Sequence, residues 1–118
     1  MTGQNIIDEV RSTLMDETEP YRFSDVLMLG FLNDGLQTLF SRRPDSVIME
    51  DDVRIRIDRP APLGQLDDPL VMEPHWRPVL VHYVLYRAYD IDSDQHEAGA
   101  AGKALGFKTR FDEGVKVT

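Results

Sequence analysis

Apolar residues recur at helical spacing in several stretches of the chain. The first stretch, Asn5–Met15, has one apolar stripe opposite polar and acidic positions, and Asn5 is its predicted N-cap. The second begins after Ser24, a suitable cap, and ends in the basic residues and proline of 41–44. Its apolar positions span an arc of roughly 220°, which is wider than one core requires. We therefore expect the second helix to bury two surfaces.

Two more helices are predicted in the second half of the chain. Pro74 and Pro78 bracket a helix start, and the run 79–89 is apolar nearly all round, which is typical of a central helix or of an element buried in an assembly. Ser93 is the predicted cap of a final alanine-rich helix that ends at Gly106. This interpretation leaves Phe107–Thr118 as an exposed arm.

The segment between the second and third helices has a different pattern. Apolar and polar residues alternate along 53–58, as in a half-buried strand, and Val47–Met49 can pair with it as a β-hairpin. Arg59–Glu73 is rich in proline and is predicted to be a loop. The predicted fold is mainly α: a small bundle of four helices over residues 1–106, with a hairpin and loop inserted at about 46–73, and an extended C-terminal arm at 107–118.

Composition limits the functions that this fold can serve. The 118 residues carry a net charge of −8, which argues against a protein whose main task is to grip a phosphate backbone. Residues 1–20 contribute −4, whereas residues 98–118 contribute +2. Two interpretations remain open: a solvated acidic surface that keeps the protein soluble, or acid placed to repel a polyanion while the C-terminal arm binds an acidic partner.

The sequence also lacks several signals. There is no cysteine, which excludes disulfides and thiolate metal sites. The N-terminus has no basic and apolar signal-peptide pattern, so we expect synthesis in the cytosol. The longest apolar stretch, Val79–Tyr89, is too short to span a bilayer, so no membrane association is expected.

No motif indicates catalysis. The histidines lack partners at metal-ligand spacing, and Asp90, Asp92 and Asp94 are not followed by the glycine and glutamate of a calcium loop. Nucleophile-elbow, phosphate-loop and dinucleotide patterns are missing as well. We therefore predict that the protein is not an enzyme, with no catalytic residue, metal or cofactor.

Aromatic residues are the remaining candidates for binding. Tyr83, Tyr86 and Tyr89 form a stripe at helical spacing, which favours core packing or a subunit contact. Trp76 fits an interface anchor as well as a core position. Arg42 and Arg43 fit helix-end charges or a binding patch.

Two stretches resemble a known family. The first runs from Tyr21-Arg22-Phe23-Ser24-Asp25 through Leu32-Asn33-Asp34 to Arg43-Pro44-Asp45, and the second is His75-Trp76 with VLVHYVLYRAYDIDSD at 79–94. Together with the alanine-rich helix, over about residues 20–106, they resemble the small head-to-tail connector (adaptor) proteins of tailed bacteriophages. The shared motifs are packing and capping patterns and carry no chemistry.

The resemblance implies a structural virion protein, assembled in the host cytoplasm and located at the head–tail junction. Such proteins form a homo-oligomeric ring, expected to be a dodecamer, that joins the portal to a tail or nozzle protein and lets DNA pass through its lumen without specific binding. We expect the C-terminal arm to bind the portal through Phe107, Lys108, Arg110, Phe111 and Lys116. We expect ring and tail contacts at Arg54, Arg56, Trp76, Tyr83, Tyr86 and Tyr89.

Two other function classes predict different behaviour. An acidic DNA mimic that blocks a host nucleic-acid-binding protein would use the net charge of −8 and would capture a basic protein in a salt-sensitive manner. A small hydrolase would use Asp51 and Asp52, or the run Asp90–Asp94, and its stability would respond to divalent metal.

Overall fold

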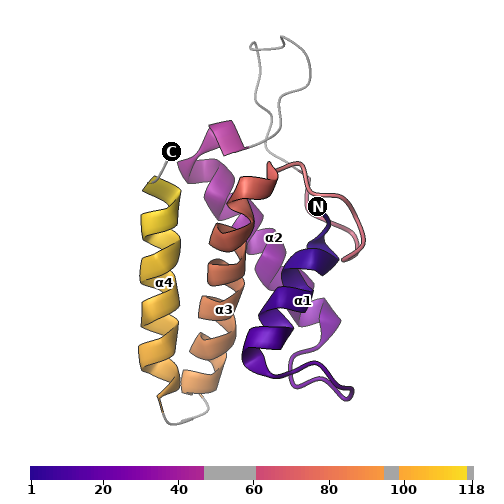
Figure 1. Ribbon diagram of the computed structural model, residues 1–118, viewed down its shortest axis with the longest axis vertical. Coiled ribbons are helices and arrows are strands. Elements are labelled where there is room, and N and C mark those ends of the chain that lie inside the picture. Colours follow the sequence, from indigo (N-terminus) through magenta and orange to yellow (C-terminus); the bar gives the residue numbers. More distant parts are fainter. Residues whose placement is uncertain (47–60, 95–98, 117–118) are drawn as a thin grey trace.

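A computed structural model describes residues 1–46, 61–94 and 99–116 (Figure 1). The elements in chain order are α1 (Gly3–Leu14), α2 (Asp25–Arg42), the 3₁₀ turns η1 (Pro44–Ser46) and η2 (Pro74–Trp76), α3 (Arg77–Asp94) and α4 (Ala100–Lys116). The mainly helical fold class is confirmed. The predicted β-hairpin lies outside the described residues, and within them Thr2 and Pro69 form an isolated bridge.

Helix α3 is the centre of the bundle. It contacts α4 on one side and α1 on the other, and α2 packs behind it (Figure 1). This position explains why the sequence of α3 is apolar nearly all round, since a helix with neighbours on three sides has little surface left for water. The core between the helices includes Ile6, Ile7, Val10, Met28, Leu32, Leu36, Leu39, Leu80, Val84 and Leu85.

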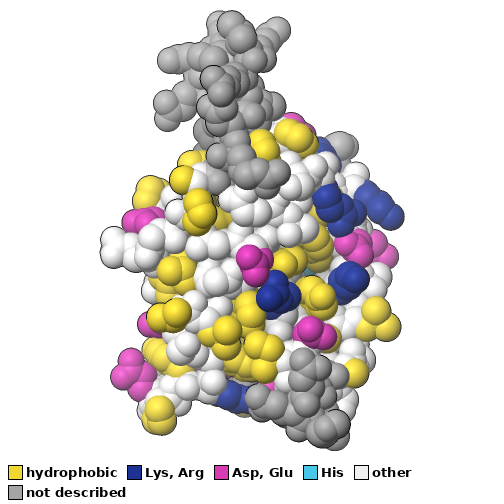
Figure 2. Space-filling model, turned by 180° about the vertical axis from the view of Figure 1, so that it is seen from behind, with side chains coloured by type: hydrophobic (Ala, Val, Ile, Leu, Met, Phe, Trp, Pro, Cys, Tyr) yellow, Lys and Arg dark blue, Asp and Glu magenta, His cyan; other side chains and the backbone are white. Residues whose placement is uncertain are grey.

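Helix α2 buries most of its wide apolar arc within the chain. Gly35 allows α2 and α3 to approach closely, because a Cβ at this position would stand 2.8 Å from Cδ1 of Tyr83. At the start of the same helix Val26 remains 82% exposed. Figure 2, which views the molecule from behind, shows apolar side chains reaching the surface on this side. The wide apolar arc is therefore buried in the middle of α2, whereas its first turn remains exposed.

The helix starts are set by short side chains. Ser24 caps α2 as predicted, and its hydroxyl accepts a hydrogen bond from the Leu27 amide at 3.2 Å. The N-cap of α1 is Thr2, so the prediction of Asn5 was wrong. Asn5 is the third residue of the helix, and its side chain accepts a hydrogen bond from the Thr2 backbone, which completes a capping box.

A buried arginine joins α1 to the start of α2. Arg11 donates hydrogen bonds to Asp16 at 2.9 Å, to the Phe23 carbonyl at 2.9 Å and to Asp25 at 2.7 Å. Asp16 also accepts from the backbone amides of Arg22 and Phe23. Because each buried charge has several partners, the turn after α1 has a defined path.

The last helix contradicts the predicted C-terminal arm. Helix α4 continues through Gly106 to Lys116, and Phe111 and Val115 are each 3% exposed. Phe111 and Val115, four residues apart, face the core, so the segment gains enough apolar burial to remain helical despite its glycines. The boundary at residue 106, which separated a domain from an arm, is therefore wrong.

Contacts with the end of α2 hold this last helix in place. Arg43 donates to the Val115 carbonyl at 2.8 Å, and Arg42 pairs with Asp112 at 2.6 Å. These basic residues at the end of α2 thus serve as contacts within the chain. A second correction concerns Ser93, which lies within α3 and does not begin α4.

Candidate interaction surfaces

The aromatic residues of α3 continue into a second row on α4. Tyr89 stacks on Phe107 with ring centres 5.7 Å apart and planes inclined by 1°, and Tyr83 meets the edge of Phe111 at 5.1 Å. Tyr83 is 9% exposed and Tyr86 and Tyr89 are half-buried. The predicted tyrosine stripe is therefore the contact between α3 and α4, and its last member reaches the surface.

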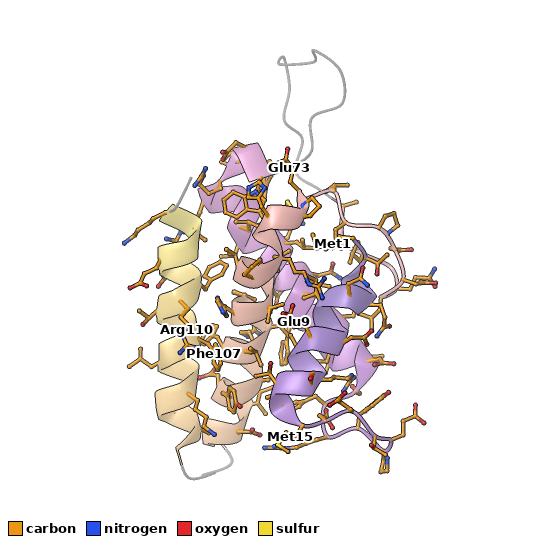
Figure 3. The ribbon with its side chains drawn as sticks, in the orientation of Figure 1. Met1, Glu9, Met15, Glu73, Phe107 and Arg110 are labelled. Carbon is orange, nitrogen blue, oxygen red and sulfur yellow. The ribbon has the colours of Figure 1, made fainter. Side chains whose placement is uncertain are left out.

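A groove of about 480 Å³ opens beside Tyr89 and Phe107. We call it the α4 groove; its lining consists of Tyr89, Gly99, Gly102, Lys103, Gly106, Phe107 and Arg110. A Cβ placed on Gly102 or Gly106 would have no atom within 4 Å, so the glycines leave free space beside the rings. Figure 3 shows Phe107 and Arg110 on the same part of α4, beside α3.

The cations of the α4 groove lie over its aromatic rings. Nζ of Lys103 is 5.3 Å from the Tyr89 ring centre, and the guanidinium of Arg110 is 4.9 Å from that of Phe107. No carboxylate pairs with either cation among the residues that the structure describes. The groove thus presents apolar surface between two positive charges that have no counter-charge in this part of the chain.

The opposite side of the bundle is acidic. We call this surface the α1 tip and define it by Met15 at the end of α1, by Glu17 and Glu19 in the turn after it, and by Asp8 in the middle of the helix. The three carboxylates form no ion pair with the described part of the chain, although Asp8 accepts a hydrogen bond from Gln4. Met15, in a left-handed conformation with φ of 58°, is 89% exposed.

The predicted portal-binding residues all lie on α4, with different exposure. Phe111 is a core residue of this chain, and Phe107 is half-buried against Tyr89. Lys108, Arg110 and Lys116 are exposed. The cations are therefore available to a partner, whereas Phe111 is not unless α4 leaves the bundle.

The residues predicted to contact the ring and the tail also differ in their exposure. Trp76 is 3% exposed, with the Arg43 guanidinium 5.1 Å from its ring centre, and its indole N–H has no acceptor within the described ranges. Trp76 and Tyr83 are thus core residues, which corrects their prediction as interface residues. Arg54 and Arg56 lie outside the residues that the structure describes.

The ionisable side chains of Asp92 and His82 on α3 lie at contacts with other parts of the chain. Asp92, from the run Asp90–Asp94 that the hydrolase hypothesis uses, is 2% exposed and pairs with Arg22. Burial against α4, followed by the nearby charge of Arg110, lowers the pKa of His82. Over residues 1–46, 61–94 and 99–116, no three His, Asp or Glu side chains gather as metal ligands would.

Sequence reasoning missed the α4 groove and the exposed position of Met15. Their position in the sequence does not show which way Gly102 and Gly106 of α4 face, and in the structure a Cβ on either would have no atom within 4 Å. The predicted first helix includes Met15, whereas α1 ends at Leu14 and Met15 is its left-handed C-cap.

No protein-family model, curated protein or solved structure matches the chain. Of the helices within the described ranges, none combines the length and apolarity that a membrane crossing requires.

Proposed function

We propose that the chain is a subunit of a head-to-tail adaptor ring of a tailed bacteriophage, which joins the portal to the tail and surrounds the path of DNA. The supporting observation is that the motifs of the resemblance coincide with helix boundaries. Ser24 caps α2 and Pro44 follows its end, and the tyrosine-rich motif lies wholly within α3. The residues that carry the resemblance to adaptor proteins therefore lie in the helices that form the bundle.

The charge distribution is compatible with this role. Duplex DNA binds proteins mainly through cations that displace its counterions, and a protomer with a net charge of −8 supplies few of them. A ring of such protomers lets DNA slide through its lumen. The DNA-mimic alternative would have to use the α1 tip, because α4 presents exposed cations.

Portal binding through a free arm is not part of the proposal. Extending Phe107–Thr118 would expose Phe111 and Val115, which are core residues. Lys108 and Lys116 are exposed outside the α4 groove, and the proposal assigns portal contact to them. Their charge suits an acidic surface on the portal.

The test is to mix the chain with the portal protein encoded in the same phage genome and measure co-sedimentation. A stable complex that Lys108→Glu/Lys116→Glu weakens and that Gln4→Glu leaves intact is the expected result. A portal that sediments without the chain, at protein concentrations of about 10 μM, contradicts the proposal.

A further inference from the structure

We propose that one copy of the chain binds a second copy head to tail, with the α1 tip of one copy in the α4 groove of the next. The inference rests on the proposed function, because this contact, repeated from copy to copy, is what closes the ring. The two surfaces that meet in this contact are the α1 tip and the α4 groove.

The α4 groove offers a binding surface that residues 1–46, 61–94 and 99–116 leave unoccupied. The stacked rings of Tyr89 and Phe107 line it, and Gly102 and Gly106 leave open space beside them. The side chains of Lys103 and Arg110 bring positive charge to these rings. Apolar surface surrounded by positive charge fits an apolar side chain flanked by carboxylates.

The α1 tip has this complementary composition. Met15 is the most exposed of the large apolar residues that the structure describes, and Glu17 and Glu19 follow it directly in the chain. A methionine is flexible and adapts to the shape of an aromatic groove, where its sulfur makes favourable contacts with ring edges. The carboxylates of the tip supply counter-charges to Lys103 and Arg110, which pair with no carboxylate in the described part of the chain.

The two surfaces lie on opposite sides of the molecule, so one chain cannot bring them together. Helix α3 separates α1 from α4, and Figure 1 shows the end of α1 and the start of α4 at the same end of the bundle. A contact that joins two different surfaces of identical chains is heterologous. Repeated from copy to copy, such a contact either closes a ring or extends a filament. Because both surfaces lie at the same end of the bundle, successive copies are displaced little along the helices, as a closed ring requires.

A second copy is the occupant that the charges favour. Residues 1–20 carry −4, and residues 98–118 carry +2, so the chain itself provides both complementary surfaces at equal concentration. Steering between opposite charges accelerates the encounter of such surfaces and weakens as salt is added.

Disulfide trapping tests the contact directly, because the chain contains no cysteine. We combine Met15→Cys and Gly106→Cys in one chain, oxidise it in low salt at about 0.5 mM protein, and separate the products by non-reducing electrophoresis. The expected result is a ladder of dimers and higher species. The matched control combines Met15→Cys with Leu105→Cys, whose side chain is 66% exposed on α4 but outside the groove. Equal ladders from both chains, or none from either, overturn the inference.

Charge reversal provides a second, independent readout. Lys103→Glu/Arg110→Glu is expected to abolish self-association in sedimentation velocity, and so is Glu17→Lys/Glu19→Lys. Lys108→Glu/Lys116→Glu, which changes the net charge by the same amount outside the groove, retains it. Mixing the two defective variants restores association, because the reversed groove then meets the reversed tip. A mixture that stays monomeric while each variant keeps its helical circular dichroism contradicts the inference.

The two proposals fail in different ways. Portal binding and rings that are indifferent to these charge reversals would overturn the head-to-tail contact and leave the adaptor function standing. Specific trapping between residues 15 and 106 without any portal binding would overturn the adaptor function and leave the contact standing. Capture of the groove by an unrelated acidic protein, with no self-trapping, overturns the inference.

Discussion

The same substitution at two glycines of α4 has opposite expected effects on stability. Gly106 faces open space, whereas a Cβ on Gly114 would stand 2.8 Å from Cγ2 of Val79 on α3. Alanine in a helix interior is favoured over glycine by about 1 kcal/mol, and this is the gain that we expect for Gly106→Ala. Gly114 is close to the helix end, so the propensity gain there is smaller.

The contact with Val79 determines the sign at Gly114. Val79 is 7% exposed and β-branched, so its side chain has little freedom to move away. Overpacking of this kind costs about 1–3 kcal/mol. After the propensity gain is subtracted, we expect Gly114→Ala to lower the free energy of unfolding by about 1–2 kcal/mol.

Urea unfolding followed by tryptophan fluorescence measures both effects. Trp76 is the only tryptophan and is 3% exposed in the core, so its emission reports loss of the bundle. If Gly106→Ala and Gly114→Ala stabilise the protein equally, residues 107–116 do not pack on α3 and the description of α4 as a complete helix is refuted.

Three further changes test other parts of the bundle. Phe111→Ala should lower the free energy of unfolding by about 3–5 kcal/mol in urea titrations, because the side chain is buried between α3 and α4; a loss below about 1 kcal/mol contradicts its core position. Arg11→Met should cost about 3–5 kcal/mol in the same assay, because it leaves Asp16 charged and buried, and a neutral result would show that the pair is not formed. His82 has a lowered pKa in the folded state, so unfolded chains bind its proton first and stability falls as pH drops through and below about 6.5. When the pH is lowered from about 7.5 to about 5.5, the free energy of unfolding should fall less for His82→Asn than for the wild type in urea titrations. Equal losses in the two proteins would contradict the lowered pKa.

Local sequence signals were sufficient to predict that most of the helices exist. They failed to predict helix ends that depend on tertiary contacts. Ser24 marked the start of α2 because capping depends on one side chain and the next three amides. Gly106 suggested a helix end, yet α4 continues because Phe111 and Val115 bury against its neighbours. The cost of a glycine is about 1 kcal/mol, which is smaller than the gain from burying one phenylalanine.

The candidate surfaces were predictable only in part. Net charge by segment already separated an acidic start of the chain from a basic end, and the structure places these on opposite sides of α3. The groove beside Tyr89 depends on how α4 is rotated against α3, which periodicity does not specify. Trp76 could have been a core or an interface residue by its sequence context, and only its burial decides between them.

The most direct test of the adaptor proposal is to image the chain mixed with its portal by negative-stain electron microscopy, with native mass measured on the same sample. The account predicts a closed ring of the chain stacked on the axis of the portal ring, with the chain in fixed stoichiometry. A chain that stays monomeric and leaves the portal bare would contradict it.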